Sequence, residues 1–229
     1  MGILQRWRRS LGRRGILRTL LHLPVVALRP LRHAFLTRLS AHRGPRLVAA
    51  RTPSVLNLGS GPEPLPGCVN VDLHFPADLC LDLTRPMPLP DACADAIISE
   101  HLIEHLPREA AERLLHECAR ILRPGGWLRV STPDLQWMVR RYLADLDSSP
   151  GKAAADGLNE RMRAHDHLHI YDEAALTGLF ARAGFVEVRR ARPGESRCEL
   201  LSGLEGRLAA LGPEEAARHL IIEGRIPPR

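Results

Sequence analysis

The chain has 229 residues, of which 45% are apolar and 25% are charged, as is typical of a soluble globular protein with one core and an extension. The best candidate for a transmembrane helix, residues 19–28, contains His22 and Pro24, so we expect no helix with the roughly 18 apolar residues that span a bilayer. The net charge of +6 is unevenly distributed, because residues 1–51 hold twelve arginines and no acidic residue precedes Glu63. A basic arm therefore precedes an acidic body.

The basic arm, which we assign to residues 1–50, contains two short amphipathic pieces at residues 3–11 and 16–23. Basic amphipathic helices that carry a tryptophan suit the surface of an anionic bilayer. An anionic membrane surface is therefore the partner that we expect for this arm. The alternatives are a nucleic acid as partner, a solvated leader segment without a partner, or an arm that packs on the body. We place the boundary of the second domain, residues 51–229, near residue 50.

The cysteines are odd in number and scattered, and no pair has the C-x-x-C spacing of a redox or zinc site. We expect reduced thiols in a cytoplasmic protein, peripheral at the inner membrane if the arm binds lipid. The five are Cys68, Cys80, Cys93, Cys118 and Cys198.

Beyond residue 54, short apolar runs alternate with helical patterns, which predicts an α/β fold with a parallel sheet. The strands are expected at residues 55–58, 69–72, 78–82, 95–99, 127–132, 185–190 and 220–226. Helices are expected from Pro107 to the RPGG stop at 123–126, over 135–146, and from a cap at Asp172 to Ala183. Residues 148–157 are expected to form a loop, and 193–218 have no clear pattern.

The most informative stretch is Val55 to Leu73, which reads VLNLGSGPEPLPGCVNVDL. A strand that leads into a Gly-Ser-Gly turn lets backbone N–H groups approach a ligand closely. An acid at the end of the next strand, Asp72, suits the two hydroxyls of a ribose. This pattern predicts a site for a nucleotide-containing cofactor.

The order of the motifs along the chain narrows the choice of cofactor. The turn is followed by Asp72, by Asp82 after a third strand, by the segment EHLIEH at 100–105 and by LRPGGW at 122–127. This series resembles the class I S-adenosylmethionine-dependent methyltransferases of the type 11 kind over residues 54–190. The amino-acid sequence of the motifs also resembles a bacterial subgroup of predicted methyltransferases associated with cell-surface polysaccharide genes. The resemblance implies a Rossmann-like, seven-stranded methyltransferase sheet with S-adenosylmethionine as cofactor.

Residue by residue, the resemblance implies that the turn holds the methionine end of the cofactor, Asp72 the ribose, and Asp82 the adenine side. Two departures stand out: Asn57 replaces the usual first acid, and only ten residues, three of them prolines, separate Gly61 from Asp72. A loop must therefore replace the first helix. The implied cofactor-binding residues are Asn57, Leu58, Gly59, Ser60, Gly61, Asp72, Leu73, Asp82, Leu83 and His101.

Two groups of histidines carry the candidate chemistry: His101 and His105 in HLIEH, and the group HDHLH at 165–169. Together they suit a metal ion, as in some RNA methyltransferases with an E-x-x-E-H motif, but His101 stands where the first glutamate of that motif would be. We therefore expect no metal. A general base for an alcohol acceptor is the simpler role, with His105, His167 and His169 as candidates and Glu104 as orienting partner. Their alternative role is structural.

The leading functional hypothesis is O-methylation of a sugar or a lipid-linked glycan. RNA methylation, with the arm on phosphates, is the alternative, but the chain lacks an N-P-P-Y-type motif and a Pro-Cys nucleophile, and only 4% of its residues are aromatic. We therefore do not expect nucleic acid as a partner. A non-catalytic, cofactor-binding scaffold is the third alternative. The pattern gives no oligomeric state.

Overall fold

A computed structural model describes residues 29–73, 77–148, 152–163, 166–204, 208 and 210–228. The amphipathic pieces expected at residues 3–11 and 16–23 lie outside these residues, as does His165. Within the described part of the chain, no helix has the length and apolar character needed to cross a membrane.

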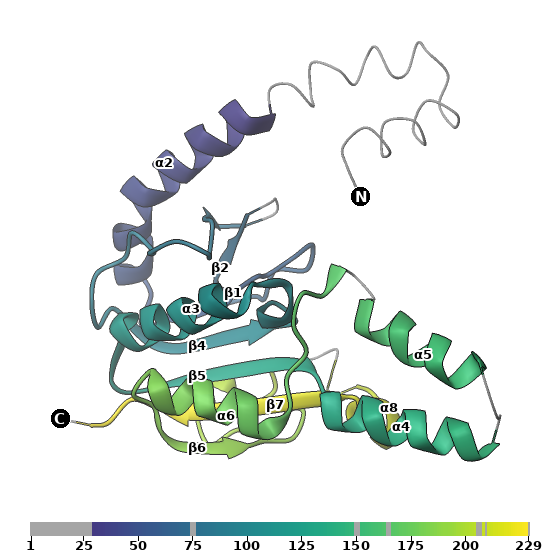
Figure 1. Cartoon of the computed structure of the whole chain (residues 1–229). Helices are drawn as coiled ribbons and strands as arrows, with labels where there is room; N and C mark the ends of the chain where they lie inside the picture. Colours follow the sequence, from purple (N-terminus) through teal and green to yellow (C-terminus); the bar gives the residue numbers. More distant parts are fainter. Residues whose placement is uncertain are drawn as a thin grey trace, which may run out of the picture.

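The described strands form one seven-stranded sheet in the order β3-β2-β1-β4-β5-β7-β6 (Figure 1). β7 is antiparallel to both of its neighbours, and the remaining pairs are parallel. All seven expected strands are present, although the third is shorter than expected, so the predicted α/β fold is confirmed. The strands are β1 (Val55–Leu58), β2 (Val69–Asp72), β3 (Leu79–Cys80), β4 (Ala94–Glu100), β5 (Leu122–Pro133), β6 (Val186–Arg190) and β7 (His219–Arg225).

One face of the sheet carries the main hydrophobic core. Side chains alternate along a strand, so Leu56, Ile97 and Leu128 from three neighbouring strands point to this face together. Helices α3 (Arg108–Ile121) and α6 (Glu173–Arg182) cover it with leucines and other apolar side chains. Burial of this face is the main stabilising contribution to the domain.

The opposite face has a smaller apolar cluster and a buried ion pair. Val55, Ala96 and Ile98 pack there against a segment that includes the short helix η3 (Glu199–Leu201). Arg129 on β5, which is fully buried, donates to Glu223 on β7 at 3.0 Å and to the carbonyl oxygens of Arg192 and Glu195. The guanidinium therefore fixes the segment after β6 onto the sheet.

Helix α2 (Arg29–Ala49) belongs to the basic arm by sequence, but its last turns lie against β3. The Ser40 hydroxyl accepts a hydrogen bond from the backbone N–H of Cys80 at 2.8 Å, and Val48 is completely buried in the main core. The N-terminal half of the helix rises away from the body (Figure 1). The boundary near residue 50 stays a prediction.

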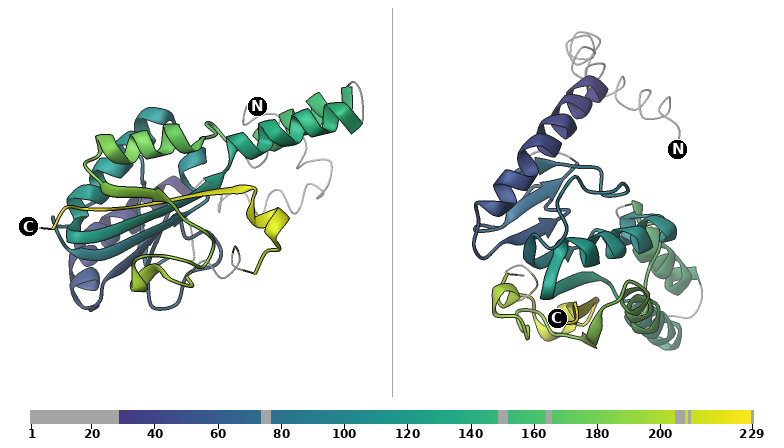
Figure 2. Two further views of the ribbon diagram at one scale, coloured as in Figure 1. Left: turned by 90° about the horizontal axis from the view of Figure 1, so that it is seen from below. Right: turned by 90° about the vertical axis from the view of Figure 1, so that its left-hand side faces the viewer.

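The loop expected at residues 148–157 is wrong over most of its length, because helix α5 (Lys152–Arg163) begins there. It packs against α4 (Leu135–Ser148), and the pair extends beyond the C-terminal end of β5 (Figure 2). Arg161 on α5 reaches Asp145 on α4 at 3.5 Å. Gly157 and the polar residues beside it favoured a loop in the sequence, because the helix is stabilised by packing on α4 and not by local propensity.

The expected helix ends are confirmed where local chemistry sets them. The side chain of Asp172 accepts a hydrogen bond from the backbone N–H of Ala175 at 2.7 Å, as an N-cap should, and Gly184 follows α6 with φ +91°. α3 ends at Ile121, two residues before the RPGG segment, which lies in β5. The segment without a clear pattern, 193–218, contains η3 and the short α8 (Pro213–Ala216).

Candidate active site

The Gly-Ser-Gly turn lies directly after β1, at the edge of the sheet where the parallel strands end. Gly59 has φ +72°, and its N–H donates to the carbonyl oxygen of Val71 on β2 at 2.8 Å. A Cβ atom at Gly59 would lie 2.9 Å from the Cβ of Leu102, so only glycine fits here. The turn is therefore held as bare backbone between β2 and the segment after β4.

Asp72 lies beside this turn, as the cofactor pattern requires. Its Oδ2 atom accepts a hydrogen bond from the backbone N–H of Gly61 at 2.8 Å. Leu73, the next residue, leaves 39% of its surface exposed. At the end of β2, a carboxylate suits the hydroxyls of a ribose, and an exposed apolar side chain suits the face of a purine ring.

Asn57 has an internal role. Its buried side-chain amide donates to Oδ1 of Asn70 at 2.9 Å, and Asn70 in turn bonds both the N–H and the carbonyl of Leu65. This network holds the loop that replaces the first helix, which confirms the predicted shortening: residues 59–68 contain no helix. Direct contact of Asn57 with a cofactor stays a prediction.

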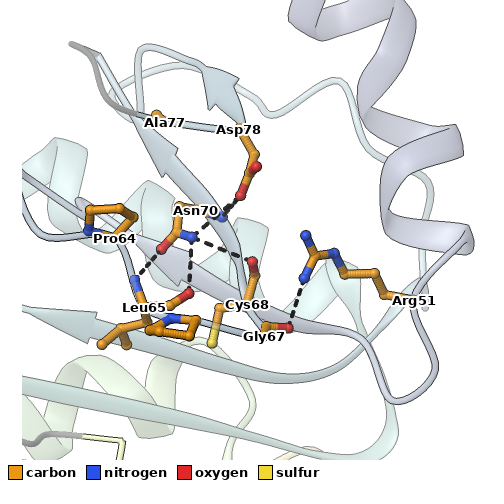
Figure 3. Close-up of a pocket in the computed structure, with 9 residues that line it drawn as sticks. Arg51, Pro64, Leu65, Gly67, Cys68, Asn70, Ala77 and Asp78 are labelled. Atoms are coloured by element: carbon orange, nitrogen blue, oxygen red, sulfur yellow. Dashed lines mark hydrogen bonds between the residues drawn. The ribbon is translucent and has the colours of Figure 1, made fainter.

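A cavity of about 470 Å³ lies on the other side of this loop (Figure 3). Arg51, Cys68 and Asp78 line it, and they precede or begin strands β1, β2 and β3. Ligands of open parallel sheets bind where strands end. This cavity therefore lies at the opposite edge of the sheet from the Gly turn, away from the strand ends where a cofactor is expected.

Asp82 lies two residues beyond the end of β3. It accepts hydrogen bonds from the N–H of Thr84 at 3.0 Å and from its hydroxyl at 2.6 Å. Partial burial raises the pKa of Asp82, but these bonds and the charge of Arg85 outweigh burial and leave it below its ordinary value. Leu83 is buried in the main core. Contact of either residue with the adenine stays a prediction.

The charged centre of the site is Glu104, which lies in the short helix η1 (Ile103–His105) and is fully buried. Its Oε1 atom pairs with Nδ1 of His101 at 2.8 Å, and its Oε2 atom accepts from the hydroxyl of Thr132 at 3.1 Å. The other nitrogen of His101, Nε2, lies 3.0 Å from Nδ1 of His219, the first residue of β7. Four side chains from four segments thus form one chain of hydrogen bonds.

The remaining candidate histidines surround the backbone of Glu104. Its carbonyl oxygen accepts from the N–H groups of Leu168 at 2.8 Å and His169 at 3.1 Å. The rings of His105 and His167 meet edge to face with centroids 5.1 Å apart. The structure therefore brings together the two histidine groups singled out in the sequence, while their catalytic roles stay predictions.

A metal ion at this position would bind the Glu104 carboxylate, which also takes part in the hydrogen-bond network. Within the described residues, ligand atoms of Glu104, His105 and His167 lie within 4.8 Å of one another. Both carboxylate oxygens of Glu104 already accept hydrogen bonds, from His101 and Thr132, and each oxygen keeps a further lone pair. The expectation of no metal stays a prediction.

His219 is the residue that sequence reasoning missed. Its pKa is lowered to about 4, first by burial and then by the charges of His101 and Arg218, which outweigh the opposing effect of Glu104. It lies 118 residues from His101 along the chain. The one available signal was its position directly before the last predicted strand, 220–226. In the structure that strand is antiparallel, so it begins where its parallel neighbours end.

Comparison with known proteins gives the family. The sequence profile of the methyltransferase domain family matches residues 33–189, which is more than half of the chain. The chain belongs to the methyltransferase domain family. In this methyltransferase-domain protein, the Gly turn, Asp72 and the Glu104 network all lie within the matched residues or, for His219, directly beside them in space.

Curated relatives match a shorter stretch. A probable S-adenosylmethionine-dependent methyltransferase of Mycobacterium tuberculosis (strain ATCC 25618 / H37Rv) is 36% identical over 102 residues, which make up 44% of this chain and 30% of that protein. One from Mycolicibacterium smegmatis is 48% identical over 99 residues, 43% of this chain and 31% of that protein. The chain therefore spans less than a third of the length of these relatives.

Among solved structures, a SAM dependent methyltransferase from Archaeoglobus fulgidus matches with a TM-score of 0.47 and 16% sequence identity. The match covers 86% of this chain and 94% of that one.

Proposed function

We propose that this protein is an S-adenosylmethionine-dependent methyltransferase that methylates a hydroxyl group of a sugar or a lipid-linked glycan. The observation that carries the proposal is the Gly turn beside Asp72 at the edge where the parallel strands end, in a chain of the methyltransferase domain family. The relatives named above as S-adenosylmethionine-dependent support the choice of methyl donor.

The hydroxyl acceptor is supported by the groups around Glu104. Methylation of an alcohol forms an O–C bond and releases a proton, so a nearby base with a pKa near neutrality assists the reaction. Several imidazoles gather beside the Gly turn, at the end of β4 and after residue 166. An amine or thiol acceptor would need less help from such groups.

The basic arm supports an acceptor at a membrane surface. In the described part of α2 there is no acidic residue, while Phe35 leaves 65% of its surface exposed and Leu39 leaves 37% exposed. Exposed apolar residues between arginines suit anionic lipid headgroups. We propose that α2 rests on such a surface and brings the site near a lipid-linked substrate.

The donor half of the proposal is tested by calorimetry with S-adenosylhomocysteine. We expect binding by the full chain and a loss of about 10- to 100-fold in affinity for Asp72→Ala, the value of a charge-assisted pair of hydrogen bonds. Asp91→Ala, an exposed acid paired with Arg120, is the matched control and leaves affinity unchanged. Absence of binding by the unaltered chain overturns the proposal.

The acceptor half is tested with methyl-labelled S-adenosylmethionine. Nucleotide sugars and undecaprenyl-linked oligosaccharides are compared with total RNA as acceptors, and we expect label only in the sugar-containing products. Flotation with phosphatidylglycerol vesicles tests the arm, since Phe35→Ser with Leu39→Ser should release the protein. Label in RNA, or salt-sensitive RNA binding by the full chain, supports the alternative function instead.

A further inference from the structure

We propose that Glu104, His101 and His219 form a proton relay, in which Nε2 of His219 takes the proton of the acceptor hydroxyl during methyl transfer. This proposal rests on the proposed function, because it assigns the base of that same reaction. It replaces His105, His167 and His169 as base candidates and gives Glu104 a defined task.

The connectivity determines which atom meets the acceptor. Both nitrogens of His101 are engaged, Nδ1 by Glu104 at 2.8 Å and Nε2 by Nδ1 of His219 at 3.0 Å. The two imidazole rings lie edge to face with centroids 4.9 Å apart. His101 therefore lies in the middle of this series of hydrogen bonds. Of the four ring nitrogens in the two histidines, Nε2 of His219 is the one that these bonds leave for a substrate.

The strand order places this atom on the acceptor side. Along the edge of the sheet the order is Asp72 on β2, the Gly turn after β1, His101 after β4, and then β5 and His219 on β7. A cofactor with its ribose at Asp72 and its methionine end at the turn directs its methyl group toward β4. The acceptor must then enter from the β5 and β7 side, where His219 lies.

Glu104 stabilises the relay at its inner end. The carboxylate is fully buried, and Thr132 holds its second oxygen at 3.1 Å. A buried carboxylate is strongly stabilised by an adjacent imidazolium, as in other base-orienting carboxylate and histidine pairs. We therefore place the transferred proton on His101, the ring that bonds Glu104 directly.

The proton balance follows from this order. The acceptor oxygen attacks the methyl carbon, the bond between that carbon and the sulfonium sulfur breaks, and the sulfur keeps the electron pair. The hydroxyl proton moves to Nε2 of His219, and the proton on Nδ1 of His219 moves to Nε2 of His101. The positive charge of the sulfonium thus reappears on His101 beside Glu104, and total charge is unchanged.

The surroundings keep the terminal imidazole unprotonated, so that its Nε2 atom has a lone pair for the proton that the relay passes on. Burial, His101 and Arg218 lower the pKa of His219 to about 4, against the opposing charge of Glu104. The ring is therefore neutral at pH 7, and the relay stabilises the transferred proton at His101. The backbone of His101 has φ +49°, a left-handed conformation that non-glycine residues seldom adopt, and it sets the ring between its two partners.

The first test is histidine-selective ¹⁵N NMR of the full chain saturated with S-adenosylhomocysteine at pH 7.5, which reports the tautomer of each ring. We expect His101 and His219 to be neutral and protonated on Nδ1. Glu104→Gln should change the His101 signals, and His219→Phe should assign those of His219. His116→Phe, on the exposed side of α3, is the control and should leave both sets unchanged.

Two NMR results overturn the relay: a doubly protonated His101 at pH 7.5, or a His219 ring protonated on Nε2, since either blocks the transfer. Failure of S-adenosylhomocysteine to bind is a separate result that counts against the proposed function itself.

The second test is kinetic, on the acceptor that the labelling experiment identifies. We expect His219→Phe to lower kcat by about 10²- to 10⁴-fold, the usual contribution of a general base, with the KM for S-adenosylmethionine unchanged and part of the rate recovered at high pH. Unchanged kcat in His219→Phe overturns the relay. Loss of turnover on EDTA treatment that Mg²⁺ restores, with His219→Phe as active as the unaltered chain, overturns it in favour of a metal.

Discussion

The two halves of the site are built in different ways. On the β1 and β2 side, backbone N–H groups hold the Gly turn: that of Gly59 donates to the carbonyl of Val71, and that of Gly61 donates to the Asp72 carboxylate. On the β4, β5 and β7 side, side chains from distant segments bond one another around buried Glu104. The Gly-turn half therefore depends mainly on a local backbone conformation, whereas the half around Glu104 depends on the assembly of the whole sheet.

The largest effect should come from breaking the buried ion pair between β5 and β7, the strands that carry part of the side-chain half. Glu223 is fully buried between Arg129 and Arg189, and the hydroxyl of Ser196 also donates to it. Glu223→Ala leaves the Arg129 guanidinium buried without its partner, and we expect a loss of about 3–5 kcal/mol in the free energy of unfolding. Urea denaturation measures it.

The control for Glu223 is Glu187→Ala, because Glu187 makes an exposed ion pair with Arg225 at 3.2 Å. Exposed pairs contribute about 0–1 kcal/mol. Equal losses in the two variants would show that burial is not the cause.

The backbone half should respond to a single added methyl group. Gly59→Ala forces a non-glycine residue to φ +72° and pushes its Cβ to 2.9 Å from Leu102. Strain of about 1–3 kcal/mol, with the displaced turn, should weaken S-adenosylhomocysteine binding about 10- to 100-fold by calorimetry.

Gly61→Ala separates the two causes in that experiment. Gly61 also has a positive φ, +60°, but an added Cβ would meet nothing within 4 Å. We expect a smaller loss of affinity than at Gly59. A loss as large as at Gly59 would assign the effect to backbone strain instead of contact with Leu102.

Acid should affect stability in two separate pH windows, one set by His219 in the side-chain half and one by the buried Glu223. The pKa of His219 is lowered from 6.5 to about 4, so the unfolded chain binds the extra proton and stability falls as the pH drops from 6.5 toward 4. His219→Phe should flatten this window in urea titrations at a series of pH values.

The second window belongs to Glu223. Burial raises its pKa, but hydrogen bonds from Arg197, Ser196 and Arg189 outweigh burial and hold the pKa below its ordinary 4.5. Its contribution is therefore present above pH 4.5 and lost as the pH falls through the folded-state pKa. Glu223→Gln should flatten only this lower window; flattening at pH 6 would contradict the assignment.

The smallest effect should come from a helix cap outside both halves. Asp172→Ala removes the bond to the N–H of Ala175 and should cost about 1 kcal/mol of unfolding free energy, with cofactor affinity unchanged. Asp156→Ala, an exposed acid on α5, is the control. A change in cofactor affinity would mean that α6 contributes to the site.

Sequence reasoning succeeded where chemistry is local along the chain. The Gly turn, the acid at the end of β2, the cap at Asp172 and the seven strands follow from residue type and short-range periodicity. It failed at α5, where packing on α4 outweighs a weak local pattern.

The sequence by itself determined that a turn follows β1 and that an acid ends β2, because glycines at a strand end are read from residue type alone. Only the tertiary structure decided the partner of His101. His219 lies 118 residues away, and it reaches the ring because β7 pairs antiparallel with β5 and so begins at the edge where β4 and β5 end. Strand pairing of this kind is set by the packing of the whole sheet, which no short stretch of sequence encodes.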